Sequence, residues 1–456
     1  MEKASGGEGR LILKNGSVLL PDEEEPKKFD IEIHGEKIIR IGRDLEEDDD
    51  TVDASGHFVL PGGIDPHVHF DDPGFTHRED FYHGTCAAAS GGITTVIDMP
   101  CTSIPPVTNL ENLKQKLSVI EKKAVVDYGL YGGVSCESFE EGFSRYMEEL
   151  STRVMGFKTY FISGMESFGR LNHYQFKTVL EKAVELGVPV LLHAEDYDYV
   201  TAATSIVERE GNTPRHYYLS RPETAEHIAA AAAAEIAAEV GADLHIVHVS
   251  SAATIEILKT KGVTAETAPH YLEFDIEDFE KTGSALKTTP PVKSPPNKHD
   301  LWRLLSDGRI RFVASDHAPC PEDEKQTGSV WTDYAGIPGT GTLFPYMFSE
   351  GYVKKRISLR RFVEAVSENA AKRYGLFHRK GSIVPGKDAD FVLIDPGKSS
   401  RVEGKKFYSK GKITPFETMR LKGKIVKTIL RGKVIFDCDR GICAEPGEGK
   451  LLERNR

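Results

Sequence analysis

The feature that most constrains the fold is an alternation of short apolar runs with helix-forming segments over residues 60–378. Four of the runs have the length and composition of buried strands, at residues 94–99, 188–193, 244–249 and 310–316. Between two of them, residues 225–240 are rich in alanine, the strongest helix former. Repeated β–α units over this length favour an α/β fold of the (β/α)8 TIM-barrel type. An open doubly wound sheet is the alternative, but no glycine-rich phosphate fingerprint follows the early strands.

Strand-and-turn patterns occupy both ends of the chain. Residues 11–20 and 31–41 predict strands with Asn-Gly or Gly turns, and residues 389–394 and 425–436 repeat this pattern. We therefore expect a small β-sandwich domain built from residues 1–59 and 379–456. The barrel, residues 60–378, would be inserted between its two halves.

Charge and cysteine content exclude several classes of protein. Lys and Arg total 58 against 70 Asp and Glu, so the net charge of −12 gives no support for nucleic-acid or anionic-membrane partners. The six cysteines show no CxxC spacing, which is typical of reduced thiols in a cytoplasmic protein. Residues 1–7 lack the apolar core of a signal peptide, and no apolar run approaches the roughly 18 residues that span a bilayer.

Two histidines, His67 and His69, lie two residues apart at the end of an apolar run. In a strand, residues i and i+2 point to the same face, so both imidazoles can reach one point. Imidazole suits zinc and neighbouring first-row metals. Barrels build their sites at the carboxyl ends of the strands, where the chain places further candidate ligands: Lys158, His193, His248 and Asp316.

Each of these residues alone would be weak evidence for a metal. A lone histidine after a strand is more often a hydrogen-bonded structural residue, and a lone aspartate there is usually a helix cap. His245 lies three residues before His248, faces the other way in a strand and is predicted to be structural. Four histidines and an aspartate that follow strand-like runs in one block nevertheless predict a metal centre.

Lys158 lies in the middle of the short apolar run 156–161. An ammonium group would repel a metal ion, but burial lowers the pKa of a lysine. The neutral amine can take up carbon dioxide and become a carbamate, whose two oxygens can bridge two metals. His67, His69 and Asp316 would then bind one divalent ion, and His193 and His248 the other, with the carbamate and a hydroxide shared.

With these motifs in view, the chain resembles the cyclic amidohydrolases, which include allantoinase, dihydroorotase, hydantoinase and dihydropyrimidinase. The resemblance spans nearly the whole sequence and is carried by motifs at residues 61–69, 91–100, 156–158, 193–195, 247–251, 269–272, 315–321 and 380–391. It implies hydrolysis of a ring amide by a binuclear centre with a carboxylated Lys158. Zinc is the expected metal, with cobalt, manganese and iron as alternatives, and relatives are commonly dimers or tetramers. Asp316 would accept the proton of the attacking hydroxide and pass it to the leaving ring nitrogen.

Four positions near the predicted site bear on the substrate. Dihydroorotases usually carry Arg, Asn and Asn where this chain has Asp71, Cys101 and Thr289, and an aspartate at the mouth would repel a carboxylate substrate. Asp71 is equally well explained by the turn sequence 71–74. Hydantoinases and dihydropyrimidinases usually carry an oxyanion-stabilising Tyr where this chain has Ser163, a weaker donor.

The motifs at residues 156–158, 219–222, 315–321 and 413–416 look most like those of allantoinase, which converts allantoin to allantoate. Allantoinases usually have Asn-Glu-Pro-Gly where this chain has Asp71-Asp72-Pro73-Gly74. The glycines of the loop 334–341, Gly339 among them, would let the backbone approach a cyclic ureide. Dihydroorotase, hydantoinase and dihydropyrimidinase are the alternatives. A non-enzymatic dihydropyrimidinase-like scaffold protein is a remote one, because a residue is present at every ligand position.

Overall fold

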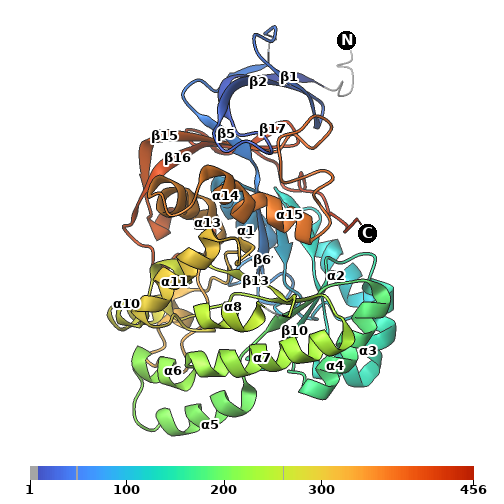
Figure 1. Cartoon of the computed structure of the whole chain (residues 1–456), viewed down its shortest axis with the longest axis vertical. Helices are drawn as coiled ribbons and strands as arrows, with labels where there is room; N and C mark the ends of the chain where they lie inside the picture. The colour runs from blue at the N-terminus through green and yellow to red at the C-terminus, as the bar shows by residue number, and fades with distance from the viewer. Residues whose placement is uncertain (1–8, 48–49, 260, 456) are drawn as a thin grey trace.

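The computed structural model describes residues 9–47, 50–259 and 261–455. Figure 1 shows a β-rich part at the top, coloured by both ends of the chain, and a larger part below in which helices surround strands. Residues 1–7, on which the signal-peptide prediction rests, lie outside the described residues. No helix within the described ranges is long and apolar enough to cross a membrane.

The β-rich part is one nine-stranded sheet in the order β18-β17-β16-β15-β5-β1-β2-β3, with β4 paired to β1. Strands β5 and β15 join its two halves as an antiparallel pair that sets Phe391 opposite Pro61. Its members come from the two ends of the chain: β1 (Arg10–Val18), β2 (Lys27–His34), β3 (Lys37–Gly42), β4 (Thr51–Asp53), β5 (Phe58–Pro61), β15 (Phe391–Arg401), β16 (Arg420–Leu430), β17 (Lys433–Asp437) and β18 (Gly441–Ile442).

The larger part contains parallel strands in two sections. One section has the order β6-β7-β8 and the other the order β14-β13-β12-β11-β10-β9. A single residue separates β8 from β9, and Val68 at the end of β6 pairs in parallel with His317 beyond β14. The two sections are therefore connected both where β8 leads into β9 and where the end of β6 pairs with the chain beyond β14. The strands are β6 (Gly63–Val68), β7 (Ile93–Asp98), β8 (Asp127–Leu130), β9 (Gly132–Gly133), β10 (Phe157–Tyr160), β11 (Val190–His193), β12 (Leu244–Ile246), β13 (Thr264–Thr267) and β14 (Phe312–Val313).

Helices connect these strands and pack outside them (Figure 1). Local sequence explains their ends: Asn172 caps the first turn of α4 in a capping box, and Gly187 ends it in the left-handed conformation. The predicted alanine-rich helix is α7, which buries Ala229, Ala233 and Ala237 along one face. The helices are α1 (Phe81–Ser90), α2 (Leu110–Ile120), α3 (Cys136–Leu150), α4 (His173–Leu186), α5 (Tyr197–Val207), α6 (Pro214–Ser220), α7 (Glu223–Val240), α8 (Ala252–Leu258), α9 (Pro269–Glu273), α10 (Ile276–Thr282), α11 (Pro295–Ser306), α12 (Glu322–Lys325), α13 (Thr340–Tyr346), α14 (Leu359–Val363) and α15 (Asn369–Arg373).

Three of the predicted strands are shorter in the structure, and two of these end before a candidate ligand. The run 244–249 forms a strand only at Leu244–Ile246, and the run 310–316 only at Phe312–Val313. The reason is that His248 and Asp316 adopt positive φ angles of 39° and 51°, which turn the chain out of the strand. Positive φ is uncommon for residues other than glycine and is concentrated at functional sites, so both side chains are held in specially built turns.

A buried ionic cluster joins the two parts of the molecule. The Lys380 ammonium lies 2.6 Å from carboxylate oxygens of both Asp127 and Asp390, and 3.0 Å from Asp388. Arg431 on the strand-connecting turn also pairs with Asp127, which begins β8. Because a buried charge is costly without partners, this cluster ties the nine-stranded sheet to the parallel strands.

Candidate metal centre

The six predicted metal ligands gather at the carboxyl ends of the parallel strands. His67 lies on β6, Lys158 on β10 and His193 at the last position of β11. His69, His248 and Asp316 lie in the turns that leave β6, β12 and β14. All six are buried or nearly so. Parallel strands that end at one edge bring residues far apart in sequence into one site.

The first group contains His67, His69 and Asp316. Asp316 Oδ1 lies 3.3 Å from His67 Nε2 and 3.5 Å from His69 Nε2. The atoms of these three residues that could bind a metal all lie within 4.8 Å of one another. His67 Nδ1 lies 2.6 Å from Glu266 Oε1, an interaction that leaves His67 Nε2 available to a metal.

The second group contains His193 and His248, whose Nδ1 and Nε2 atoms face each other at 3.0 Å. The other nitrogen of His193 lies 3.0 Å from Glu195 Oε2, which also accepts a hydrogen bond from Arg221 at 2.5 Å. The rings of His67 and His248 lie 5.3 Å apart, so the two groups are adjacent. Carboxylates behind His67 and His193 orient the imidazoles, as outer partners of metal ligands generally do.

Lys158 is fully buried, and its Nζ atom has no hydrogen-bond partner among the described residues. Burial lowers the pKa of Lys158 to about 8, although the negative charges of nearby acidic groups act against the shift. A substantial fraction of the amine is therefore neutral near physiological pH. Two unsatisfied buried nitrogens, Lys158 Nζ and His67 Nε2, fit a site that binds cations through a modified lysine.

Asp316 is the charged acceptor at this site. Burial raises the pKa of its carboxyl group, but the nearby imidazoles of His67, His69 and His248 outweigh burial and hold that pKa well below its usual value. Asp316 is therefore ionised across the range in which enzymes work. Its carboxylate can bind a metal and can also accept a proton from a water molecule.

A cavity of about 270 Å³ opens onto these residues. Among its lining residues are His69, His193, His248 and Asp316, together with Tyr160, Arg221 and the loop 334–336. Of the predicted substrate contacts, Cys101 and Thr289 line the cavity. Cys101 Sγ lies 3.0 Å from Tyr160 Oη, and Thr289 Oγ1 lies 2.6 Å from Tyr217 Oη.

The structure places the other three predicted contacts outside the cavity lining. Ser163 Oγ accepts a hydrogen bond from the Met165 amide. The Gly339 amide donates to His317 Nδ1, and a Cβ atom at position 339 would lie 2.8 Å from the Ser315 carbonyl oxygen. The requirement for glycine at position 339 therefore comes from close packing against the chain beyond β14.

Asp71 differs from its expected position at the mouth of the site. It is fully buried in a left-handed turn with φ of 56°, and neither of its carboxylate oxygens has a hydrogen-bond partner among the described residues. Burial raises the pKa of Asp71 well above its usual value. Because Asp71 does not line the cavity, the structure gives no support to the expected repulsion of a carboxylate substrate, while the absence of an arginine at this position still counts against dihydroorotase.

Sequence reasoning missed the residues that support the ligands. Glu266 is the third residue of β13, and its side chain contacts both His67 and His245. The one available signal was an acidic residue in a short strand, a residue type that is almost never fully buried unless it is paired. Glu195 belonged to a quoted motif but received no role.

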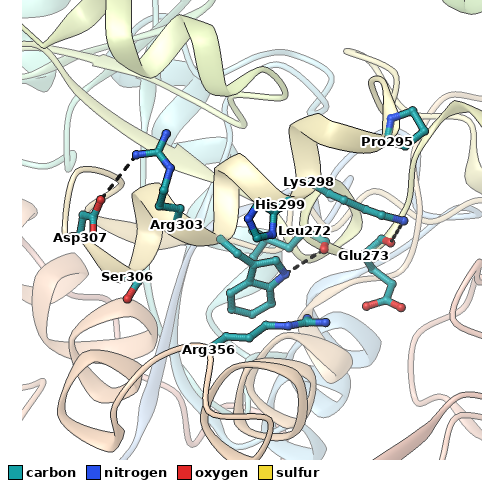
Figure 2. A pocket seen from close by; sticks show the side chains of 10 residues that line it. Leu272, Glu273, Pro295, Lys298, His299, Arg303, Ser306, Asp307 and Arg356 are labelled. Atoms are coloured by element: carbon teal, nitrogen blue, oxygen red, sulfur yellow. Dashed lines mark hydrogen bonds and ion pairs between the residues drawn. The ribbon is translucent and has the colours of Figure 1, made fainter.

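A larger cavity of about 620 Å³ lies between α9 and α11 (Figure 2). Its charged side chains already have partners: Lys298 pairs with Asp275 at 2.7 Å, and Arg303 lies 3.7 Å from Asp307. Arg356 lies over the ring of Trp302. None of the predicted site residues line this cavity, so the chemistry is assigned to the smaller one.

A sequence model of the amidohydrolase family matches residues 58–435. The chain belongs to the amidohydrolase family. The matched segment contains all six candidate ligands, and the resemblance inferred from the sequence motifs is confirmed.

Individual members of the amidohydrolase family align with nearly the whole chain. An allantoinase of Escherichia coli (strain SE11) is 36% identical over 457 residues, which cover 98% of this chain and 99% of that protein. The L-hydantoinase (dihydropyrimidinase) of Arthrobacter aurescens has a solved structure with a TM-score of 0.92 and 30% identity, covering 97% of this chain and 99% of that one. The dihydropyrimidinase of Brevibacillus agri NCHU1002 has a solved structure with a TM-score of 0.90 and 30% identity, covering 98% of this chain and 99% of that one.

Proposed function

We propose that this protein is a metal-dependent hydrolase of the C–N bond of a cyclic ureide, and that allantoin is its substrate. The observation that carries the proposal is the convergence of four histidines, a buried lysine and an ionised aspartate beside one cavity of about 270 Å³. The similarity to allantoinase over 98% of the chain supports the choice of substrate. The similarity of the structure to hydantoinases and dihydropyrimidinases supports hydantoin or dihydrouracil as the second candidate.

The residues present fit two divalent ions, for which zinc is our proposal. His67, His69 and Asp316 would hold one ion, and His193 and His248 the other, with Lys158 joining both after carboxylation by carbon dioxide. Two such ions would polarise a ring carbonyl and lower the pKa of a water molecule. Neutral Lys158, favoured by burial, is the form that reacts with carbon dioxide.

The chain itself supplies proton transfer and orientation. Asp316 would take the proton of the attacking water on its carboxylate and deliver it to the leaving ring nitrogen. Glu266 and Glu195 would keep His67 and His193 in the tautomers that present one nitrogen to the metal. Cys101 and Thr289 would contact the ring of the substrate from the cavity wall.

We also infer that the two sections of parallel strands close into one (β/α)8 barrel, residues 60–378. Residues 1–59 and 379–456 would form the β-sandwich domain. The pairing of Val68 with His317 and the single residue between β8 and β9 support this closure. A cytoplasmic homodimer or homotetramer is the proposed state of the protein. Light scattering on purified protein tests the assembly.

A side-by-side assay tests the substrate. Protein reconstituted with zinc and bicarbonate should hydrolyse allantoin with a higher kcat/KM than hydantoin, dihydrouracil or dihydroorotate. A preference for hydantoin or dihydrouracil would establish the second candidate. A preference for dihydroorotate would overturn the argument from Cys101 and Thr289. Inactivity on all four by a protein carrying two metals per chain would refute the proposed function, whereas the same inactivity in a pure preparation with near-zero metal per chain would favour the scaffold protein.

A further inference from the structure

One wall of the cavity is formed by two loops that are distant in the sequence. Thr289 comes from the segment that follows α10, and Tyr334, Ala335 and Gly336 come from the segment that follows α12. Neither loop belongs to a strand, and the nearest strand-like contact is a single bridge between Ile337 and His317 that follows the second loop. The Gly336 amide donates to the carbonyl oxygen of Lys287 at 3.0 Å, which is the backbone hydrogen bond that joins them.

Lys325, the last residue of α12, lies where the two loops meet. Its ammonium donates to three backbone carbonyl oxygens: those of Lys287 at 3.1 Å, Tyr334 at 2.9 Å and Gly336 at 2.5 Å. The residue is 1% exposed. An ammonium has three N–H donors, and here each has one acceptor, although burial lowers the pKa of Lys325 to about 7.

A second buried lysine reinforces the first. Lys287 Nζ donates to the carbonyl oxygen of Asp333. Each loop therefore accepts a hydrogen bond from the other, since the Gly336 amide donates to the Lys287 carbonyl oxygen. The Asp333 carboxylate in turn accepts hydrogen bonds from Ser284 and from the Thr327 amide. Together Lys287 and Lys325 bind the carbonyls of residues 333, 334 and 336, which leaves little freedom to the loop that lines the cavity.

We propose that Lys325, assisted by Lys287, is a positioning residue that fixes the loop 333–336 as the substrate-binding wall of the cavity. This proposal rests on the hydrolase function proposed above and extends it. Lys325 does not line the cavity or contact the candidate ligands. Its effect on the substrate is therefore transmitted through the backbone of Tyr334, Ala335 and Gly336.

Lys325→Met is the decisive variant, because methionine keeps an unbranched buried stem and removes all three donors. The KM for allantoin should rise by about tenfold or more, the change that accompanies loss of about 1.4 kcal/mol of binding. The kcat and the metal content should stay within about threefold, because the ligands are untouched. Amide hydrogen exchange of residues 333–337 should become about tenfold faster.

Lys387→Met is the matched control. Lys387 is also buried and also donates to backbone and side-chain oxygens, of Lys380 and Ser382, but it lies outside the cavity. This variant should leave both the KM and the exchange of residues 333–337 unchanged. If Lys325→Met fails to fold, Lys287→Met provides the same test with a smaller expected change, since one donor interaction is lost.

The two readouts separate the possible failures. An unchanged KM together with unchanged exchange at 333–337 would refute the positioning role. A fall in kcat with loss of metal and no change in KM would also refute it, because the lysine would then act on the ligands. Wild-type protein that hydrolyses no cyclic ureide would refute the proposed function, while the exchange experiment would still decide whether Lys325 holds the loop.

Discussion

Glu266→Gln provides the sharpest test of how the metal centre is oriented. Three nitrogen atoms lie around the buried carboxyl group: His67 Nδ1 at 2.6 Å, His245 Nε2 at 3.3 Å and the His248 amide, a donor, at 3.4 Å. Glutamine is nearly isosteric but offers one acceptor oxygen and one NH2 group. In one orientation of the amide its NH2 group faces His67 Nδ1 and the His248 amide, and in the other it faces His245 Nε2.

The expected magnitude follows from these contacts. Loss of an outer partner of a metal ligand typically lowers metal affinity by about 10- to 100-fold, which corresponds to about 1.4 to 2.7 kcal/mol. The short contact to His67 and complete burial of Glu266 place the change toward the upper end of this range. Weaker retention of metal at His67, His69 and Asp316 should then limit activity at low metal concentration and be overcome by excess metal.

The assay is a competition between the protein and a chromophoric zinc chelator, with the temperature of unfolding measured in parallel. Glu273→Gln is a suitable control, since that partly buried carboxylate accepts a hydrogen bond from Tyr346 and lies outside the site. If Glu266→Gln binds zinc within twofold of the wild type while His67→Ala does not, the orienting role of Glu266 is disproved.

Three further predictions concern charge. At a fixed concentration of dissolved carbon dioxide, reconstitution of the apoprotein should be about tenfold slower at pH 7 than at pH 9. Burial lowers the pKa of Lys158 to about 8, so the fraction of reactive neutral amine increases as the pH rises through that value. A rate that does not change with pH would contradict this. Asp316→Asn should lower kcat by about 10²- to 10⁴-fold at full metal occupancy, as measured with allantoin, and near-normal turnover would remove Asp316 from its proton-transfer role. Lys380→Met should lower the free energy of unfolding by about 3–5 kcal/mol, measured by urea denaturation, because three buried carboxylates lose their shared cation. Lys433→Met, which breaks an exposed pair with Glu448, should cost less than about 1 kcal/mol, and equal effects of the two variants would refute the importance of burial.

The candidate ligands were predictable because each follows an apolar run, and the ends of parallel strands meet at one edge. His67, His193 and Lys158 lie on strands where the periodicity placed them. The ends of the strands at His248 and Asp316 were not predictable. A positive φ in a residue other than glycine depends on tertiary contacts that no local pattern records.

The supporting residues could not be predicted for a different reason. Glu266 contacts a histidine that lies far from it in the sequence, and Lys325 binds carbonyl oxygens on two separate loops. Such contacts exist only after the chain has folded. The burial of Asp71 is a further case, because the turn motif does not reveal it. The residue types in the sequence therefore indicated the chemistry of the site. The position of the loop that lines the cavity, residues 333–336, could be learned only from the structure.

The pairing of β5 with β15 has a consequence for how the protein is made. Pro61 and Phe391 are neighbours in the sheet, yet about 330 residues separate them, which a ribosome adds in roughly 15 to 65 seconds. During that interval the edge of β5 that will receive β15 is unpaired, and an unpaired edge readily captures another strand. Aggregation of the nascent chain should therefore be most sensitive to slow translation before residue 391, and to chaperones that cover the first 61 residues.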